Sequence, residues 1–330
     1  MTKESKSMNL FVSLTNKIKG KNLSVVFPEA TDTRVLGAAV RLAQDELLRP
    51  VLLGDPTEIK RVADEKNFDL NSSEIIDPNN YADYEAMVAA FVERRKGKAT
   101  KEQAETILRD ETYFGTMLVY MDKADCLVSG AVHSTANTVR PALQIIKTKP
   151  GMTRTSGAFI MQRGDERYLF ADCAININPN AQELAEIAVQ SAKSAELFGI
   201  EPIVGLLSFS TKGSAKSEEV EKVAEATKIA HELAPDLQLD GELQFDASFV
   251  PSVAAQKAPD SKVAGNVKVF VFPELQSGNI GYKIAQRFGN FEAIGPVLQG
   301  LNKPVSDLSR GANEEDVYKT AILTAAQALD

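Results

Sequence analysis

The amino-acid sequence predicts an α/β protein with two domains, each a three-layer αβα arrangement built on a mostly parallel sheet. Short β-branched runs alternate with amphipathic helical patterns from one end of the chain to the other, and this alternation is typical of parallel sheets with helices on both faces. At 330 residues the chain exceeds the usual size of one hydrophobic core. A punctuated stretch at residues 149–153, KPGMT, interrupts the alternation, and we expect the domain crossover there.

In the first part of the chain, strand and helix patterns follow each other in turn. Asp32 or Thr31 can cap the first helix, because a side-chain oxygen at that position accepts bonds from the first helical N–H groups. The expected strands are 22–28, 50–53 and 125–129, and the expected helices are 31–48, 57–66, 81–95, 101–123 and 139–147.

After the crossover the sequence predicts a hairpin, in which strands 156–162 and 168–174 flank the polar turn Arg163-Gly164-Asp165. Alternation then resumes. The remaining expected strands are 202–209, 267–272 and 294–299, and the remaining helices are 181–198, 217–233, 280–288 and 314–329. In such sheets ligands bind at the carboxyl ends of the strands, so the loops there are the candidates for function.

Composition excludes several classes of function. The net charge of −8, from 45 acidic and 37 basic residues, argues against binding nucleic acid or an anionic membrane by bulk attraction. Only two cysteines are present, and we find neither an apolar signal region nor a membrane-length apolar run, which indicates a reducing cytoplasm. Two histidines are too few for most histidine-rich metal sites.

The segment Ser309-Arg310-Gly311, followed by Asp316, carries three groups suited to acyl transfer to or from a phosphate. Ser309 could donate to an oxyanion, Arg310 could hold an anion and Asp316 could accept a proton. Spacing alone favours helix capping for Asp316, since Asn313 can be the N-cap with Asp316 at the third helical position. Both roles stay open.

Two loops earlier in the sequence could hold anions at a helix N-terminus. The loop 208–214 offers Ser210, Thr211 and Lys212, although it lacks the Walker A spacing and could equally be a helix cap. The stretch 276–281, QSGNIG, resembles a backbone anion nest that includes Asn279 and Gly281, and it lacks the GxGxxG spacing of a dinucleotide site.

A third small-residue loop, 129–135, contains Ser129 and Thr135, and Arg140 lies about one turn into the helix beyond it. A lone histidine in such a loop, here His133, is more often a supporting residue than a catalyst. The basic run 94–98 is typical of a solvated helix end, where the helix dipole favours positive charge.

Six strings in order give the chain a close resemblance to the phosphate acetyltransferases, within the wider family of phosphate acetyl- and butyryltransferases. They are PEATDTRVLGAA from Pro28, SGAVHSTANTVRPALQIIKTKPG from Ser129, LLSFSTKGSA from Leu206, DGELQFDAS from Asp240, FPELQSGNIGYKIAQR from Phe272, and GPVLQGLNKPVSDLSRG from Gly295.

The resemblance implies reversible transfer of an acetyl group between coenzyme A and phosphate, with coenzyme A as substrate, no metal and no permanently bound cofactor. It also implies a two-domain fold like that of isocitrate and isopropylmalate dehydrogenases, with the active-site cleft between the domains, and a homodimer. In that fold the first domain is discontinuous, here residues 1–150 with 296–330, and the second is 151–295.

The resemblance also assigns residues. Ser309, Arg310 and Asp316 match the active site, and the proton acceptor for the coenzyme A thiol would be Asp316. Functional arginines match Arg140, Arg34 and, by approximate alignment, Arg94 or Arg95. Many relatives carry Cys after the SRG string where this chain has Ala312, which puts a thiol-covalent mechanism there in doubt.

Three alternatives stay open. A phosphate butyryltransferase would use the same chemistry on a longer acyl chain. A non-catalytic regulatory domain of the same fold is disfavoured, because the chain keeps Ser309, Arg310 and Asp316 together. A decarboxylating dehydrogenase would need acidic metal ligands and a nucleotide loop, and the sequence has neither pattern.

Overall fold

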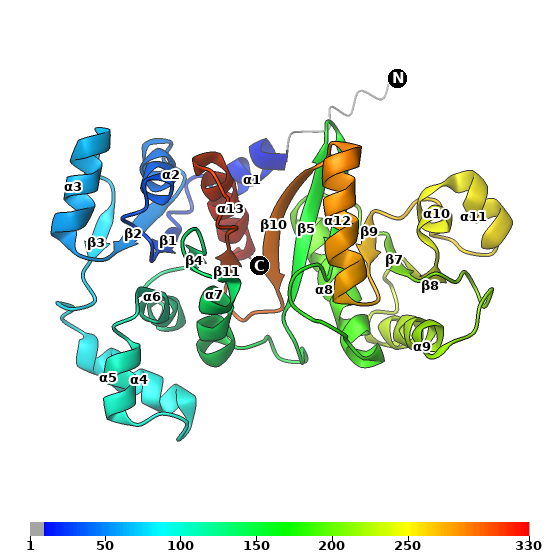
Figure 1. Ribbon diagram of the computed structural model, residues 1–330, viewed down its shortest axis with the longest axis horizontal. Coiled ribbons are helices and arrows are strands. Elements are labelled where there is room, and N and C mark those ends of the chain that lie inside the picture. Colours follow the sequence, from blue (N-terminus) through cyan, green and yellow to red (C-terminus); the bar gives the residue numbers. More distant parts are fainter. Residues whose placement is uncertain (1–9, 330) are drawn as a thin grey trace. The chain divides into compact units, whose positions relative to one another are not determined.

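The computed structural model describes residues 10–329, which divide into two compact units (Figure 1). The N-terminal unit is formed by Phe11–Lys149 and by the C-terminal segment from Leu301 on, and the central unit is formed by Pro150–Gly300. The chain therefore leaves the N-terminal unit once and returns to it.

The N-terminal unit is a parallel α/β structure with strand order β3-β2-β1-β4-β11. From β1 the chain continues to β2 and β3 on one side, and β4 and β11 are added on the other side. The order thus reverses between β1 and β4, and such a switch point is where α/β sheets bind ligands. Its elements are α1 Leu10–Ile18, β1 Ser24–Phe27, α2 Thr33–Gln44, β2 Arg49–Leu53, α3 Pro56–Lys66, β3 Glu74–Ile76, α4 Tyr84–Arg95, α5 Lys101–Ile107, α6 Glu111–Tyr120, β4 Cys126–Ser129, α7 Thr135–Pro141, the π-helix η1 Ala142–Ile146, β11 Val305–Asp307 and α13 Glu314–Gln327.

Burial explains why the central strands of this unit lie where they do. Val25, Val26 and Phe27 of β1 are fully buried, because a parallel strand with helices on both faces has no solvent side. The helices α2 and α13 contact each other and lie side by side in Figure 1. Each begins just after a strand end, so both N-termini lie near the switch point.

The central unit contains a mixed sheet with strand order β10-β5-β6-β9-β7-β8. Strand β5 is antiparallel to both of its neighbours, and the other pairs are parallel. In Figure 1, α12 runs along β5. Its elements are β5 Ser156–Arg163, β6 Glu166–Ala171, α8 Ala181–Leu197, β7 Val204–Leu207, α9 Glu218–Leu233, β8 Leu239–Leu243, α10 Phe245–Phe249, α11 Pro251–Lys257, β9 Val269–Val271, α12 Leu275–Gly289 and β10 Glu292–Gln299.

Mixed, mostly parallel strands alternating with helices confirm the predicted α/β class, and the β5–β6 pair confirms the predicted hairpin. One expected helix, 101–123, is two helices, because Asp110 caps a new helix by accepting bonds from Thr112 and Tyr113. The expected helix 139–147 begins earlier, as α7, and continues as η1. Strands β3, β8 and β11 and helices α1, α10 and α11 were not predicted.

The segment 276–281, expected to be a loop that opens a helix, is helical throughout. These residues lie inside α12, which begins at Leu275. The Glu274 carboxylate accepts hydrogen bonds from the backbone N–H groups of Gln276 and Ser277 at 2.7 and 2.8 Å. Part of the first turn is therefore already capped by the protein's own carboxylate.

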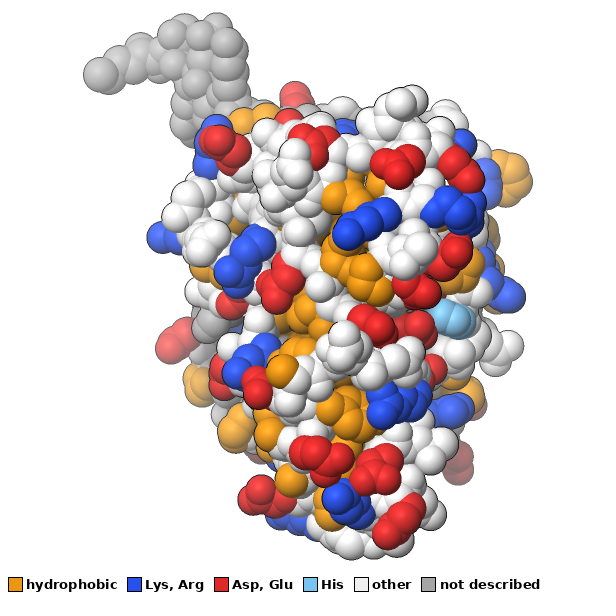
Figure 2. Space-filling view, turned by 90° about the vertical axis from the view of Figure 1, so that its left-hand side faces the viewer, with side chains coloured by type: hydrophobic (Ala, Val, Ile, Leu, Met, Phe, Trp, Pro, Cys, Tyr) orange, Lys and Arg blue, Asp and Glu red, His pale blue; other side chains and the backbone are white. Residues whose placement is uncertain are grey.

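On the face shown in Figure 2, the described basic and acidic side chains are interspersed, and neither sign forms a continuous patch. Within residues 10–329 no helix is long and apolar enough to span a bilayer.

Candidate active site

Three loops of the N-terminal unit meet the switch point. The first, residues 28–32, follows β1 and leads into α2, whose first turn carries Arg34; the second, loop 130–133, follows β4; and the third, loop 309–312, follows β11. Because β1, β4 and β11 are neighbouring parallel strands, their carboxyl ends lie at one edge of the sheet. The fold thus brings together segments almost 300 residues apart in sequence.

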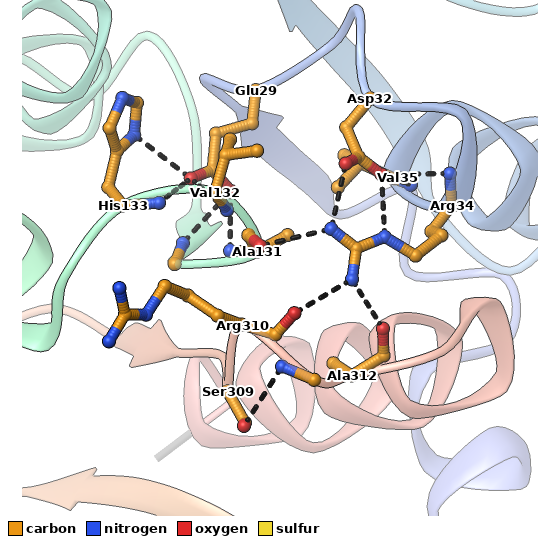
Figure 3. Close-up of polar contacts among 12 residues, drawn as sticks. Glu29, Asp32, Arg34, Val35, Ala131, Val132, His133, Ser309, Arg310 and Ala312 are labelled. Carbon is orange, nitrogen blue, oxygen red and sulfur yellow. Dashed lines mark hydrogen bonds and ion pairs between the residues drawn. The ribbon is translucent and has the colours of Figure 1, made fainter.

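Loop 309–312 is exposed at its first three residues, and Ala312 is buried. Ser309 and Arg310 are exposed, and the Ser309 hydroxyl oxygen accepts a 3.2 Å hydrogen bond from the Gly311 N–H. In Figure 3 the Arg310 side chain points away from Arg34. The hydroxyl and the guanidinium therefore lie together on an accessible turn.

The capping box predicted for α13 is present. The Asn313 N–H donates to Asp316 Oδ2 at 2.9 Å, and the Asp316 N–H donates to Asn313 Oδ1 at 2.9 Å. Asp316 is nevertheless exposed. Capping occupies one carboxylate oxygen, so capping and proton transfer are compatible roles for Asp316.

Arg34 holds all three loops together with the five donors of its guanidinium group (Figure 3). Nε and one Nη2 donor reach the Asp32 carboxylate at 3.0 and 2.8 Å, and Nη2 also donates to the Ala131 carbonyl at 3.0 Å. The two Nη1 donors reach the carbonyls of Arg310 at 3.0 Å and Ala312 at 2.7 Å. An anion could contact this guanidinium only if one of these bonds broke or were shared.

The contact between Asp32 and Arg34 also shifts the pKa of both side chains. The hydrogen bonds from Arg34 and its positive charge outweigh the effect of burial and hold the pKa of Asp32 below its usual value. The hydrogen bond to Asp32 raises the pKa of Arg34. Asp32 additionally caps α2, so this pair is fixed to the helix N-terminus.

Glu29 is a buried acid that the sequence analysis missed. Its carboxylate accepts hydrogen bonds from four successive backbone N–H groups, those of residues 130–133, at 2.8 to 3.1 Å. His133 Nδ1 also lies 2.9 Å from Glu29 Oε1. The loop is thus an anion nest that is filled by the protein itself. The available signal was weak: an acidic residue two positions after the buried strand β1.

Asp307, at the end of β11, is a second buried acid that was missed. Its Oδ2 accepts a 2.6 Å hydrogen bond from the Thr135 hydroxyl, and its Oδ1 has no hydrogen-bond partner among the described residues. Burial raises the pKa of Asp307 to about 6; the charge of Glu29 adds to the increase and the Thr135 hydroxyl opposes it. A Cβ atom on Gly130, whose φ is +114°, would lie 2.4 Å from Asp307 Oδ1, so glycine is required there.

The predicted arginines fall into two groups. Arg94 donates to the carbonyls of Ile145 and Ile146 at 2.6 and 3.0 Å, and so it caps the end of η1. By contrast, no hydrogen bond or ion pair within residues 10–329 involves the guanidinium groups of three arginines, and these are Arg95, Arg140 and Arg310.

A positive field surrounds the first two of these unpaired arginines. Burial raises the pKa of Tyr113, and the charges of Arg140 and Arg95 oppose that increase. Partial burial lowers the pKa of Lys147, and the nearby charges of Arg94, Lys96, Arg95 and Lys98 lower it further. The run 94–98 is therefore part of a basic cluster with Lys147.

Two other predicted residues flank the second loop: Ser129 ends β4 and Thr135 begins α7. Ser129 is fully buried, and its hydroxyl has no partner among the described residues. Thr135 is exposed as a residue, yet its hydroxyl is bonded to Asp307.

In the central unit, the loop at 208–214 is fastened internally. Ser210 is fully buried and donates to Glu242 Oε1 at 3.1 Å, and Thr211 is buried and donates to Gln244 Oε1 at 3.1 Å. Lys212 pairs with the Asp240 carboxylate and donates to the Gly241 carbonyl.

Asn279 and Gly281 of α12 have packing roles in the same unit. Asn279 Nδ2 donates to the Cys173 carbonyl at 3.1 Å, and a Cβ atom on Gly281 would lie 3.0 Å from the Phe272 ring. In the part of the chain that the structure covers, His, Cys, Asp and Glu side chains nowhere gather in a group of three suited to a metal ion.

These observations define a class of protein: an α/β protein whose candidate site is built from loops at a switch point, with an exposed hydroxyl, carboxylate and guanidinium. A family model described as phosphate acetyl/butaryl transferase matches residues 9–325. The chain belongs to that family. It is 63% identical over 321 residues to the phosphate acetyltransferase of Bacillus subtilis, covering 97% of this chain and 99% of that protein. It is 60% identical over 326 residues to the Staphylococcus epidermidis phosphate acetyltransferase, with 97% and 99% covered.

Solved structures agree with this membership. A phosphotransacetylase from Streptococcus pyogenes superposes with a TM-score of 0.96 at 62% identity, covering 100% of this chain and 99% of that one. A branched-chain phosphotransacylase from Enterococcus faecalis gives a TM-score of 0.66 at 18% identity, covering 93% and 99%, and it shares the fold.

Proposed function

We propose that this protein is a phosphate acetyltransferase, which transfers an acetyl group reversibly between acetyl-coenzyme A and phosphate. The observation that carries the proposal is that Ser309 and the unpaired Arg310, on the turn after β11, and Asp316, in the first turn of α13, are all exposed within eight residues. The near full-length similarity to phosphate acetyltransferases supports the same reaction.

In the proposed reaction, Asp316 takes the proton from the coenzyme A thiol, and the thiolate attacks the carbonyl carbon of acetyl phosphate. Ser309 and nearby backbone N–H groups donate hydrogen bonds to the tetrahedral oxyanion. The new carbon–sulfur bond forms, the carbon–oxygen bond to phosphate breaks, and inorganic phosphate leaves. The solvent exposure of Asp316 supports this role, because the carboxylate that caps α13 stays accessible.

We assign anion binding to the arginines that have no protein partner. Arg310 and Arg140 would hold the phosphoryl group, and Arg95 would help to bind the phosphates of coenzyme A. An unpaired guanidinium can offer a two-pronged contact to a phosphate without losing an existing bond. The basic cluster of residues 94–98 with Lys147 supports the assignment, because its mutual repulsion is relieved when an anion binds.

The free-energy contributions of the three proposed effects can be compared. An alkyl thiol of pKa about 8.5 is roughly 3% ionised at pH 7, so complete ionisation supplies about 2 kcal/mol. One oxyanion donor contributes about 3 kcal/mol. Holding two anionic substrates in attack geometry contributes about 7–11 kcal/mol. The arginines should therefore matter at least as much as the base.

The test mixes acetyl phosphate with coenzyme A, without added metal, and follows thioester formation and phosphate release together. We expect equal amounts of both products. Butyryl phosphate in a parallel reaction separates the two acyl chains, since each added methylene in a fitted pocket costs about 10–200-fold in kcat/KM. A preference for butyryl phosphate would instead make the protein a phosphate butyryltransferase, and no thioester from either substrate would refute the proposal.

We also propose a homodimer that works in the cytoplasm. One face of α12 carries the exposed apolar residues Ile280, Ile284 and Phe288 at four-residue spacing, and Phe288 is 86% exposed. A second copy of the chain would cover this stripe. Cys126 and Cys173 are buried and unpaired, which supports a reducing compartment.

A further inference from the structure

Glu29 controls the backbone conformation of loop 130–133. Its side chain is 1% exposed, and an ionised carboxylate can accept about four hydrogen bonds. It accepts from the N–H groups of Gly130 and Ala131 through Oε2, and from those of Val132 and His133 through Oε1. Four successive amides therefore converge on one buried carboxylate.

Arg34 connects that loop to loop 309–312. It donates to the Ala131 carbonyl in one loop and to the Arg310 and Ala312 carbonyls in the other. The two carbonyls on either side of Gly311 are thus pinned, which fixes the direction of the turn that carries Ser309. The Ala312 N–H closes the same turn on the Ser309 carbonyl at 2.9 Å.

We propose that Glu29 and Arg34 are positioning residues for the acyl transfer, an inference that rests on the proposed function. Glu29 sets the shape of loop 130–133, and Arg34 sets its spacing from the turn bearing Ser309 and Arg310. Neither residue binds substrate. Glu29 is buried and negative, and the five donors of Arg34 are satisfied by protein acceptors.

In this arrangement Arg34 and Arg310 have different roles. Arg34 uses its fork to hold two loops at a fixed separation, and Arg310, on the turn so held, keeps its fork available for an anion. Displacement of a positioned group by about 1 Å can lower a rate about 10²-fold. The effect of losing Glu29 or Arg34 should accordingly fall on kcat rather than on substrate affinity.

The first test is Glu29→Gln, which keeps the shape and replaces one acceptor oxygen with an NH₂ group facing two backbone donors. We expect kcat to fall about 10- to 100-fold, with the KM of acetyl phosphate and of coenzyme A within about threefold of wild type. The matched control is Glu183→Gln. Glu183 is also mostly buried and accepts a backbone N–H bond, that of Asn180 at 3.0 Å, in the capping box of α8 in the central unit. It should keep wild-type kcat.

The second test is Arg34→Lys, which keeps the charge and loses the fork. We expect a lower kcat with the equilibrium dissociation constants of inorganic phosphate and coenzyme A, measured by calorimetry, within about threefold of wild type. In the double variant with Glu29→Gln the losses should be less than multiplicative, because both residues act on the same two loops. A tenfold weaker phosphate affinity with unchanged kcat would make Arg34 a direct anion ligand and overturn its positioning role.

Hydrogen exchange of the backbone amides makes the test independent of activity. In Glu29→Gln the amides of residues 130–133 should exchange at least about tenfold faster than in wild type or in Glu183→Gln. Unchanged exchange, or a loss of kcat shared by the Glu183→Gln control, would overturn the inference. Wild-type protein that makes no thioester would refute the proposed function alone, and the exchange result would still decide whether Glu29 organises the loop.

Discussion

The most informative single substitution is Asp316→Asn, because the structure gives Asp316 a capping role and the proposed mechanism gives it a proton. An asparagine at 316 keeps an oxygen that can accept the 2.9 Å hydrogen bond from the Asn313 N–H. The substitution therefore removes the negative charge and leaves the cap.

The structural cost of this change is small. A charge in the first turn of a helix is worth about 0.3–1 kcal/mol, and Glu314 and Glu315 remain in the first turn of α13. The melting temperature should fall by about 2–4 °C at most, given the size of each unit. Loss of a general base lowers a rate about 10²–10⁴-fold, which is about 3–5 kcal/mol in the barrier. The activity loss should thus far exceed the stability loss.

The assay compares kcat, the KM for acetyl phosphate and the melting temperature of Asp316→Asn with those of Asn313→Ala. The alanine variant loses the N-cap acceptor at a cost of about 1 kcal/mol and keeps the carboxylate, so its kcat should stay within about threefold of wild type. We expect Asp316→Asn to lose kcat with its KM nearly unchanged. A kcat close to wild type for Asp316→Asn, or equal losses in both variants, would refute the base role and leave only the cap.

Three further predictions concern Arg140, Asp307 and Phe288. Arg140→Lys should lower kcat despite its retained charge, because a two-pronged phosphate contact is lost. A wild-type kcat for this variant in steady-state assays would rule out that Arg140 binds phosphate in this way. Asp307→Asn should be more stable than wild type at about pH 7.5, by up to about 3 kcal/mol. The folded-state pKa of about 6 lies above the ordinary 3.8, so wild-type stability falls as the pH rises between these values. The melting temperature of Asp307→Asn should therefore exceed that of wild type by less at pH 4 than at pH 7.5. An equal difference at both pH values would contradict the raised pKa of Asp307. Phe288→Asp should break the proposed dimer contact on α12 and so halve the wild-type mass measured by light scattering. An unchanged mass would show that the apolar stripe on α12 is not the dimer contact.

The sequence predicted the elements whose local signals are strong. The strand at β1 and the helix α2, capped by Asp32, follow from a β-branched run and a side-chain cap. Strands β3 and β11 were missed, because each has three residues, too few for a periodic pattern to emerge. Strand β9 is equally short and was predicted because it lies within the longer strand-like run 267–272. Missing β11 mattered most, since this strand carries loop 309–312 to the switch point.

The sequence indicates site residues that are close together in the chain more readily than those that meet only in the fold. Ser309, Arg310 and Asp316 are close in sequence, so their meeting needs little tertiary information. Glu29 acts on a loop more than 100 residues away, and no local pattern indicates that a buried carboxylate will meet four amides. The anion-binding loops predicted from their small residues illustrate the same limit. Their composition indicates that backbone donors are present, and only the fold decides that Glu29, Glu242 and Glu274 already occupy such donors.

The central claim is direct transfer, in which the thiolate of coenzyme A attacks bound acetyl phosphate with no acyl-enzyme intermediate. The decisive measurement is exchange of labelled inorganic phosphate into acetyl phosphate in the absence of coenzyme A, with initial rates recorded at several fixed concentrations of each substrate. Direct transfer predicts intersecting rate patterns and no exchange without coenzyme A. Parallel rate patterns with exchange that needs no coenzyme A would place the acetyl group on the protein, with Ser309 as the nearest nucleophile, and would contradict the mechanism.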